Sequence, residues 1–117
     1  MILTLDLSAD RALFHQIVDG VKRALVDGQL DPGAALPPGR ELAGVLDVSL
    51  ETVQRAYRQL ADEGIVTSRV GRGTRVADPI DIDRLELDSV IEDLVERARH
   101  AGVSSKNLIK LIDQAYR

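Results

Sequence analysis

The sequence predicts a mainly helical fold with one small β-hairpin, which is an α+β class. Apolar residues recur at steps of three and four in the first part of the chain and again in the last part, as they do on amphipathic helices. Between these regions, residues 36–76 form a pattern of two short helices, a tight turn and a two-stranded wing closed by Gly-Arg-Gly. That order is typical of a winged helix-turn-helix, so we expect residues 1–77 to form such a domain and residues 78–117 a helical tail.

The composition limits the size and the class of the protein. With 117 residues, 44% of them apolar, the chain suffices for one compact core and a small appendage, and two large domains are excluded. The absence of cysteine excludes disulfides and thiolate metal sites, and it fits a reducing cytoplasm. The first residues have no basic start and no long apolar run, so we expect a cytoplasmic protein without a membrane partner.

The net charge of −4 is unevenly distributed along the chain. Residues 1–35 carry three basic and five acidic side chains, residues 36–77 carry six and five, and residues 78–117 carry six and nine, which gives −2, +1 and −3. The positive segment is the one with the winged-helix pattern. Because phosphate binding needs a positive surface, we expect a small positively charged patch for nucleic acid in this segment. Its arginines are Arg40, Arg55, Arg58, Arg69, Arg72 and Arg75.

The first helix is predicted from its apolar stripe and from the residues around it. Ile2, Leu3 and Leu5 indicate a short strand or an extended arm, followed by a helix cap at Ser8 or Asp10. The helix should bury its stripe against the next two helices and end near a glycine. The stripe and that glycine are Leu13, Phe14, Ile17, Val18, Val21, Leu25 and Gly28.

The second and third helices are predicted from their boundaries. Two prolines at 37 and 38 stiffen the entry to a helix from about Gly39 to Leu46. Asp47 and Val48 make the turn, and Ser49 is placed to cap the third helix. Counting 100° per residue, the side of the third helix that should face the core holds Val53, Ala56, Tyr57 and Leu60.

The opposite side of the third helix is polar. It presents Glu51, Gln54, Arg55 and Arg58, with Thr52 at the flank. Such side chains contact base edges and phosphates from a helix in a major groove, and Arg55 is the best candidate for a bidentate contact to guanine. The alternative interpretation is an ordinary solvated face on which Glu51 and Arg55, four residues apart, pair with each other.

The wing is predicted over Ile65–Arg69 and Thr74–Val76. Gly71 and Gly73 flank Arg72 and allow positive φ at the turn, which lets the backbone approach a phosphate. Arg72 would then project toward a minor groove or the DNA backbone. Any hairpin can use such a turn, so the signal depends on the helices that precede it.

Taken together, residues 13–77 resemble the DNA-binding domain of GntR-type bacterial transcription regulators. The matching residues are Leu13, Phe14, Gln16, Ile17, Gly28, Gln29, Leu30, Pro32, Gly33, Leu36, Pro37, Arg40, Glu41, Leu42, Ala43, Val48, Ser49, Thr52, Val53, Ala56, Tyr57, Leu60, Glu63, Gly64, Gly71, Arg72, Gly73 and Thr74. The resemblance implies that Arg40 contacts a phosphate or a base edge and that Ser49 and Thr52 hold the backbone at the start of the recognition helix. It also implies that Gly73 shapes the wing tip.

This chain departs from that family pattern at two places. Leu50 stands where the family often has a basic residue, and Glu51 where a small polar residue is common. Pro38 and Gly39 replace a frequent serine near the start of the second helix. The departures imply one or two fewer contacts to the groove or the phosphates. The DNA sequence that this chain prefers therefore cannot be inferred by analogy with the family.

The tail is predicted to be a helical hairpin for dimerisation. Its two apolar runs are separated by Gly102 and Ser104. The dimerisation residues are Leu87, Val90, Ile91, Leu94 and Val95 on the first helix and Leu108, Leu111 and Ile112 on the second. Two such helices cannot hide both stripes alone, so we expect them to pack with a second chain rather than fold back on the winged domain. A 40-residue tail resembles that of the YtrA subfamily, which lacks a large effector domain.

Enzymatic or metal chemistry has little support in the sequence. His15 and His100 are interpreted as surface histidines, and no catalytic residue, metal or cofactor is expected. The acidic residues after the wing lack the spacing of a calcium loop and are interpreted as a solvated linker with acids at a helix start. They are Asp78, Asp81, Asp83, Glu86 and Asp88.

The function predicted from the sequence is a sequence-specific, homodimeric transcriptional regulator. It would act as a repressor that occupies an inverted-repeat operator in double-stranded DNA. The alternative is a winged-helix module that binds protein without specific DNA binding, as the acidic total and Leu50 would suit. The sequence does not decide whether a small-molecule effector binds in the apolar seam of the tail, because no cluster of residues marks a pocket there.

Overall fold

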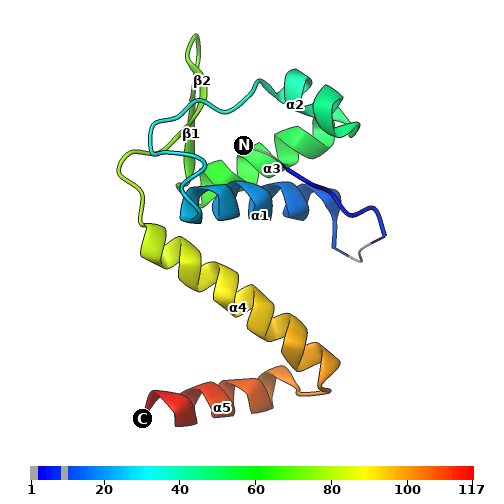
Figure 1. Cartoon of the computed structure of the whole chain (residues 1–117), viewed down its shortest axis with the longest axis vertical. Helices are drawn as coiled ribbons and strands as arrows, with labels where there is room; N and C mark the ends of the chain where they lie inside the picture. The colour runs from blue at the N-terminus through cyan, green and yellow to red at the C-terminus, as the bar shows by residue number, and fades with distance from the viewer. Residues whose placement is uncertain (1–2, 9–10) are drawn as a thin grey trace.

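The computed structural model describes residues 3–8 and 11–117 and shows the predicted α+β fold. Figure 1 shows a helical domain with a small wing, from which one long helix leads away to a shorter one at the C-terminus. The elements are α1 (Leu13–Val26), α2 (Gly39–Leu46), α3 (Leu50–Asp62), β1 (Val66–Arg69), β2 (Gly73–Val76), α4 (Ile82–His100) and α5 (Ser105–Tyr116).

The core lies between α1, α3 and the base of the wing. The predicted stripe of α1, apart from Leu13, meets the predicted inner side of α3 there, which confirms both patterns for these residues. Tyr57 differs from the other inner residues of α3 because its ring is only half-buried. The largest fully buried side chains are Ile17, Val18, Val21, Val53, Leu60 and Val66.

The turn between α2 and α3 has the predicted geometry. The helix α2 spans Gly39–Leu46 and ends at Asp47, which adopts a left-handed conformation with φ of 55°. Ser49 caps α3, since its Oγ accepts a hydrogen bond from the backbone N–H of Thr52 at 3.1 Å. The hydroxyl oxygens of Ser49 and Thr52 are also 2.8 Å apart, so both predicted residues hold the start of this helix.

Replacing Ser49 by alanine should lower the free energy of unfolding by about 1 kcal/mol, because one N–H of the first turn of α3 loses its acceptor. Urea denaturation of the variant and the parent measures this difference. A Ser105→Ala variant is the matched control, because Ser105 is exposed and lies inside the first turn of α5 without a capping role. Equal losses in the two variants would contradict the assigned role of Ser49.

The wing is an antiparallel pair in which Val66 faces Val76 and Arg69 faces Gly73. Residues 33–36 run along the other side of β2, and the backbone N–H of Leu36 donates to the carbonyl of Thr74 at 2.8 Å. The strand β2 is therefore supported on both edges near its base. This support fixes the hairpin relative to α1 and α3.

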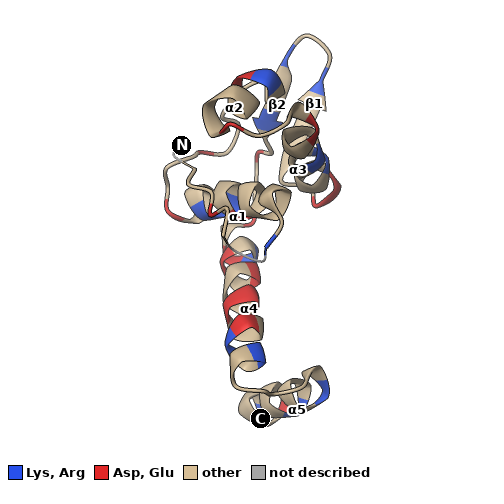
Figure 2. Cartoon of the chain, turned by 90° about the vertical axis from the view of Figure 1, so that its right-hand side faces the viewer, with Lys and Arg blue, Asp and Glu red and all other residues tan. Residues whose placement is uncertain are grey.

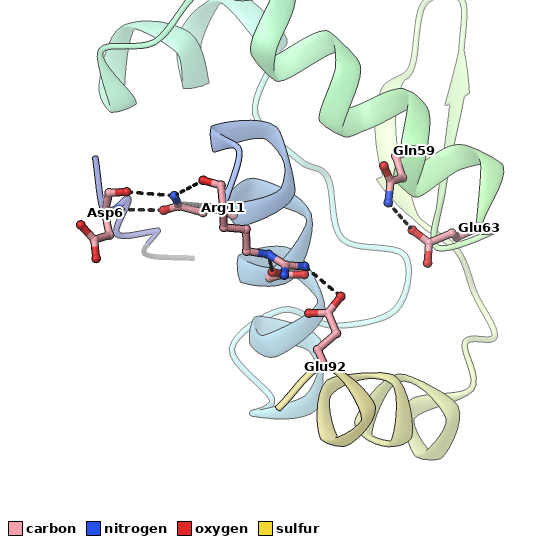
Figure 3. A network of polar contacts seen from close by, with 7 residues as sticks. Asp6, Arg11, Gln59, Glu63 and Glu92 are labelled. Atoms are coloured by element: carbon pink, nitrogen blue, oxygen red, sulfur yellow. Dashed lines mark hydrogen bonds and ion pairs between the residues drawn. The ribbon is translucent and has the colours of Figure 1, made fainter. Parts of the chain in front are cut away.

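The N-terminal segment forms an extended arm rather than a strand, and the predicted cap at Ser8 is wrong. The helix α1 begins at Leu13 after Ala12, without a side-chain cap, while the backbone N–H and hydroxyl of Ser8 donate to Asp6. Gln16 holds the arm instead, since it accepts from the backbone N–H of Asp6 and donates to its carbonyl. Figure 3 shows this pairing. The other predicted cap, Asp10, and Ile2 lie outside the described residues.

The first half of α4 packs against α1. Leu85 is buried in the core of the winged domain. Arg11 joins the two helices, because it pairs with Asp19 of α1 at 2.6 Å and with Glu92 of α4 at 2.9 Å (Figure 3). Burial raises the pKa of Glu92, the neighbouring Asp19 raises it further, and Arg11 opposes both effects. The tail therefore begins at a fixed angle to the winged domain.

The tail consists of the two predicted helices, but they do not form a closed hairpin. Gly102 adopts φ of 72° and Ser104 caps α5, as the pattern indicated. After that turn α5 diverges from α4, as Figure 1 shows. Within the described part of the chain, no helix is long and apolar enough to cross a membrane.

Candidate nucleic-acid interface

The start of α2 is tied to the middle of α3. The hydroxyl of Tyr57 donates to the backbone carbonyl of Pro37 at 2.7 Å. Burial of the ring and the nearby carboxylate of Glu41 raise the pKa of Tyr57 to about 12. This contact sets where Arg40, in the first turn of α2, lies relative to α3.

The raised pKa of Tyr57 predicts a loss of stability in strong alkali. In the unfolded chain the phenol ionises near pH 10, whereas in the folded chain it does so near pH 12, so stability present below pH 10 is lost as the pH rises to 12. The free energy of unfolding of the parent, minus that of Tyr57→Phe, should therefore fall over this range. Urea titrations at several pH values measure the difference. Tyr116→Phe, with its ring exposed on α5, is the control and should follow the parent at every pH.

Two departures from the family pattern contact each other. A β-carbon added at Gly39 would lie 3.3 Å from Cδ1 of Leu50, so the glycine leaves room for the leucine between α2 and α3. Leu50 is half-buried by this packing. Pro38 precedes α2 without any side-chain cap, as expected for the missing serine. At both places, the chain has close helix packing where the family often has polar groups.

The outer face of α3 carries the predicted polar residues. Glu51, Gln54 and Arg58 are exposed on the side of the helix opposite Val53 and Leu60. Thr52 lies at the flank and is half-buried. The three exposed side chains form the part of α3 that a groove in DNA would meet first.

Arg55 occupies the flank of α3 that faces α1. Its guanidinium carbon lies 3.9 Å above the centre of the Phe14 ring, which is a cation–π contact. The alternative pairing of Glu51 with Arg55 is not among the ion pairs of the described residues. To reach a base, the guanidinium of Arg55 would first have to leave Phe14.

The wing tip has the predicted glycine geometry. Gly71 and Gly73 have φ of 82° and 69°, in the left-handed region that side chains disfavour. The backbone N–H of Arg72 donates to the carbonyl of Arg69 at 3.0 Å and closes the turn, so the side chain of Arg72 is exposed at the tip. The neighbouring Val70 is also fully exposed.

The arginines of this region are free of acidic partners. Residues 36–77 hold six arginines, all of them exposed, and none takes part in an ion pair within the described residues. By contrast, Arg11, Lys22 and Arg84 outside this region are paired with carboxylates. Figure 2 shows the basic positions on α2, α3 and the wing, while α4 carries mainly acidic ones along its first turns. The winged end therefore presents six arginines without ion-pair partners, in a region whose net charge is +1.

The wing contains two arginines to which the sequence pattern assigned no contact. Arg69 and Arg75 belong to the two strands, and the pairing of Thr67 with Arg75 and of Arg69 with Gly73 places both on the same face of the hairpin. The alternation of side chains along each strand would reveal from the sequence that Arg69 and Arg75 share a face, but only once the pairing register is known. The register depends on the length of the turn. The sequence placed the start of the second strand at Thr74, whereas β2 begins one residue earlier, at Gly73, which pairs with Arg69.

The two histidines differ in their surroundings, and one of the acidic residues after the wing caps a helix. His100 is exposed as predicted. His15 is half-buried, with its ring edge-on to that of Phe14 and the two ring centres 4.2 Å apart. Asp81 caps α4 by accepting from the backbone N–H of Arg84, in line with acids at a helix start. In residues 3–8 and 11–117, no group of three or more potential metal ligands comes together.

The predicted dimerisation residues lie on an open surface of the tail. Most of them are exposed, and Leu94, Val95 and Leu108 are half-buried. On α4 this stripe lies about half a turn around the helix from Leu85, which faces the winged domain. The exposed members are Leu87, Val90, Ile91, Leu111 and Ile112, joined by Ile109 and Tyr116.

Comparison with known proteins identifies the family. The family described as "Bacterial regulatory proteins, gntR family" matches residues 13–76, which is more than half of the chain and includes α1, α2, α3 and the wing. The chain belongs to the gntR family of bacterial regulatory proteins. It is a transcriptional regulator with a DNA-binding winged-helix domain, and not an enzyme.

The similarity of this gntR-family regulator extends through its tail. It is 28% identical to the HTH-type transcriptional repressor YtrA of Bacillus subtilis (strain 168) over 97% of its own length and 91% of that protein. Its structure resembles YtrA from Sulfolobus acidocaldarius, a GntR-family transcription factor, with a TM-score of 0.63, 27% identity, and coverage of 97% of this chain and 96% of the other. It also resembles AraR(DBD) in complex with operator ORE1, with a TM-score of 0.56, 25% identity, and coverage of 66% and 94%.

Proposed function

We propose that this gntR-family protein is a homodimeric repressor that binds an inverted-repeat operator. One observation carries the proposal: exposed arginines without acidic partners gather on α2, α3 and the wing, while the exposed apolar stripe lies on α4 and α5 at the other end of the molecule (Figures 1 and 2). The winged end is suited to binding a polyanion such as DNA, and the tail is suited to packing against a second copy of the chain. Two of the related proteins, a transcriptional repressor and a DNA-binding domain in complex with its operator, support the same function.

In this proposal α3 is the recognition helix and enters a major groove. Glu51, Gln54 and Arg58 would read base edges, because they are exposed on its outer face. Arg55 would join them only after its guanidinium leaves Phe14, so DNA competes with an intramolecular contact for this side chain. Thr52, which is half-buried beside Ser49, orients the first turn of the helix.

The contacts to the DNA backbone would come from both sides of α3. Arg40 lies in the first turn of α2, and Arg72 lies at the wing tip, next to the positive φ of Gly73. Both arginines are exposed and form no ion pair within the described residues, so binding a phosphate breaks no internal ion pair. Ser49 completes this set by holding the start of α3 where its N-terminus can approach a phosphate.

Dimerisation would use the stripe on α4 and α5. Because that stripe faces away from the winged domain of its own chain, a second tail can cover it without displacing the contact between α1 and α4. A two-fold arrangement would then place two recognition helices on one side of a duplex. Residues 78–117 act as the dimerisation unit in this scheme, although Leu85 also belongs to the core of the domain at residues 1–77.

The proposed mechanism is occlusion in the cytoplasm, where the DNA lies. A dimer on its operator would keep other proteins off the same stretch of duplex. No effector is required for this action. One open hollow lies beside the wing, and another lies between the end of α3 and the start of α4.

The test is a titration of DNA from the chain's own upstream region at fixed salt. Arg58→Ala should weaken specific binding by about 1 to 3 kcal/mol and relax the preference at one base position, because it removes a contact to a base edge. Arg55→Ala should do the same if that guanidinium leaves Phe14. Arg72→Ala should weaken all sequences more evenly. Arg23→Ala, an exposed arginine at the end of α1, is the control.

Three results would separate the possibilities. A specific, salt-sensitive shift that Arg23→Ala leaves unchanged supports the regulator. No shift even at low salt would favour a winged-helix module that binds protein. Retention of parental affinity by Arg58→Ala, Arg55→Ala and Arg72→Ala alike would show that other residues make the contacts.

A further inference from the structure

The two faces of the wing differ in character. The register places Val66 opposite Val76 and Ser68 opposite Thr74 on the face that packs toward the core, and the hydroxyl oxygens of Ser68 and Thr74 are 2.8 Å apart. The other face therefore holds Thr67, Arg69, Gly73 and Arg75. Gly73 stands opposite Arg69 and has no side chain to cover it.

That second face borders a hollow of about 330 Å³. Arg69, Arg75 and the tip residue Arg72 line it together with Thr67, and on the other side it is closed by Gly33 and by the segment from Ala77 to Pro79. Three arginines thus line one concave surface. A hollow of this size has room for a tetrahedral anion and for the waters that accompany it.

The hollow is positively charged, and part of it is held in place. Nη1 of Arg75 donates to the carbonyl of Gly33 at 3.2 Å, which fixes this side chain along the edge of the hollow. None of the three arginines forms an ion pair within the described residues. Asp78 is the one carboxylate among the lining residues, and it lies on the Gly33 side. Three positive charges against one negative charge favour an anion.

We propose that this hollow binds a phosphate group. Guanidinium groups match the geometry of phosphate oxygens with paired donors, and Thr67 adds a hydroxyl. A phosphate of the DNA backbone beside the wing and a free phosphorylated ligand share this chemistry. If the bound phosphate belongs to the DNA backbone, the inference deepens the proposed function and rests on it. If the phosphate belongs to a free ligand, the inference is independent of the proposed function.

The first arm of the experiment measures DNA binding by the full chain as a function of salt. Arg75→Gln removes the charge and keeps a polar side chain, and Arg69→Gln makes the same change on the neighbouring strand. If the hollow holds a backbone phosphate, each variant should bind both operator and random duplex more weakly. The slope of log K against log [salt] should also fall by about 0.9 for each phosphate that the variant no longer neutralises. Arg23→Gln is the matched control and should keep the parental slope.

The second arm uses inorganic phosphate without DNA. Thermal unfolding of the parent is measured in phosphate and in chloride of equal ionic strength. If the hollow binds a free phosphate, phosphate should raise the Tm of the parent and of Arg23→Gln but not that of the double variant Arg69→Gln/Arg75→Gln. Circular dichroism of each variant tests whether the substituted protein is still folded.

The outcomes distinguish this inference from the proposed function. Reduced slopes in the first arm identify the duplex as the source of the phosphate, and a selective rise in Tm in the second arm identifies a free phosphate. If the parent binds DNA while the wing variants keep its slope and phosphate protects none of the proteins selectively, the inference is wrong and the proposed function stands. If no protein binds DNA but phosphate protects the parent selectively, the proposed function fails and the inference stands.

Discussion

Replacing Ile112 by aspartate should convert the proposed dimer into monomers. The side chain of Ile112 is 45% exposed in the single chain, on the apolar stripe of α5, so the substitution leaves the core of the protomer intact. In a two-fold interface each substitution occurs twice, and losing one buried isoleucine costs about 1.5 to 3 kcal/mol per copy. The dimer dissociation constant should therefore rise by roughly 10² to 10⁴, before any cost of burying the new charge.

Sedimentation or light scattering over a range of protein concentration measures this change. Gln114→Asp is the matched control, because Gln114 is exposed on the opposite side of α5 and receives the same new carboxylate. Operator affinity should fall when the dimer is lost. A monomer binds each half-site separately and lacks the gain in affinity that comes from linking two recognition helices. A dimer of unchanged strength in Ile112→Asp would show that the stripe is not the interface.

The helix boundaries followed from local chemistry, and the sequence predicted them closely. For α2 the prediction of Gly39–Leu46 agrees with the structure, because two prolines precede the helix and Asp47 adopts the left-handed turn after it. The same holds for the cap at Ser49. At the start of α1 the local signal failed, since the arm is held by the side chain of Gln16 rather than by a cap at Ser8. A contact of that kind joins residues ten apart and leaves no periodic pattern.

The surroundings of the proposed contact residues could not be predicted in the same way. Arg55 belongs to the polar side of α3 by its spacing, but its contact with Phe14 depends on how α1 crosses α3. The tail shows the same limit. Its spacing predicted two amphipathic helices, whereas the angle between them depends on tertiary packing, which the spacing does not encode. Patterns thus identify which residues share a face, and tertiary packing decides what that face meets.

Replacing Leu60 by alanine should produce the largest loss of stability in the winged domain. Leu60 has 0% of its surface exposed and lies in the core shared by α1, α3 and β1. Removing three buried carbons leaves a cavity that the surrounding close-packed side chains fill only partly. The expected cost is about 2 to 5 kcal/mol, a large part of the roughly 5 to 15 kcal/mol that stabilises a typical domain.

Urea denaturation should show a lower midpoint with an unchanged slope, because the variant loses stability without changing the surface exposed on unfolding. Leu7→Ala is the matched control: it removes the same atoms from a side chain that is 81% exposed on the arm, and it should keep the parental midpoint. Below its transition, Leu60→Ala should bind DNA with parental affinity, because none of the proposed DNA-contacting residues has changed. A comparable loss in Leu7→Ala would instead mean that the arm, docked on α1 through Gln16, stabilises the fold as much as the core does.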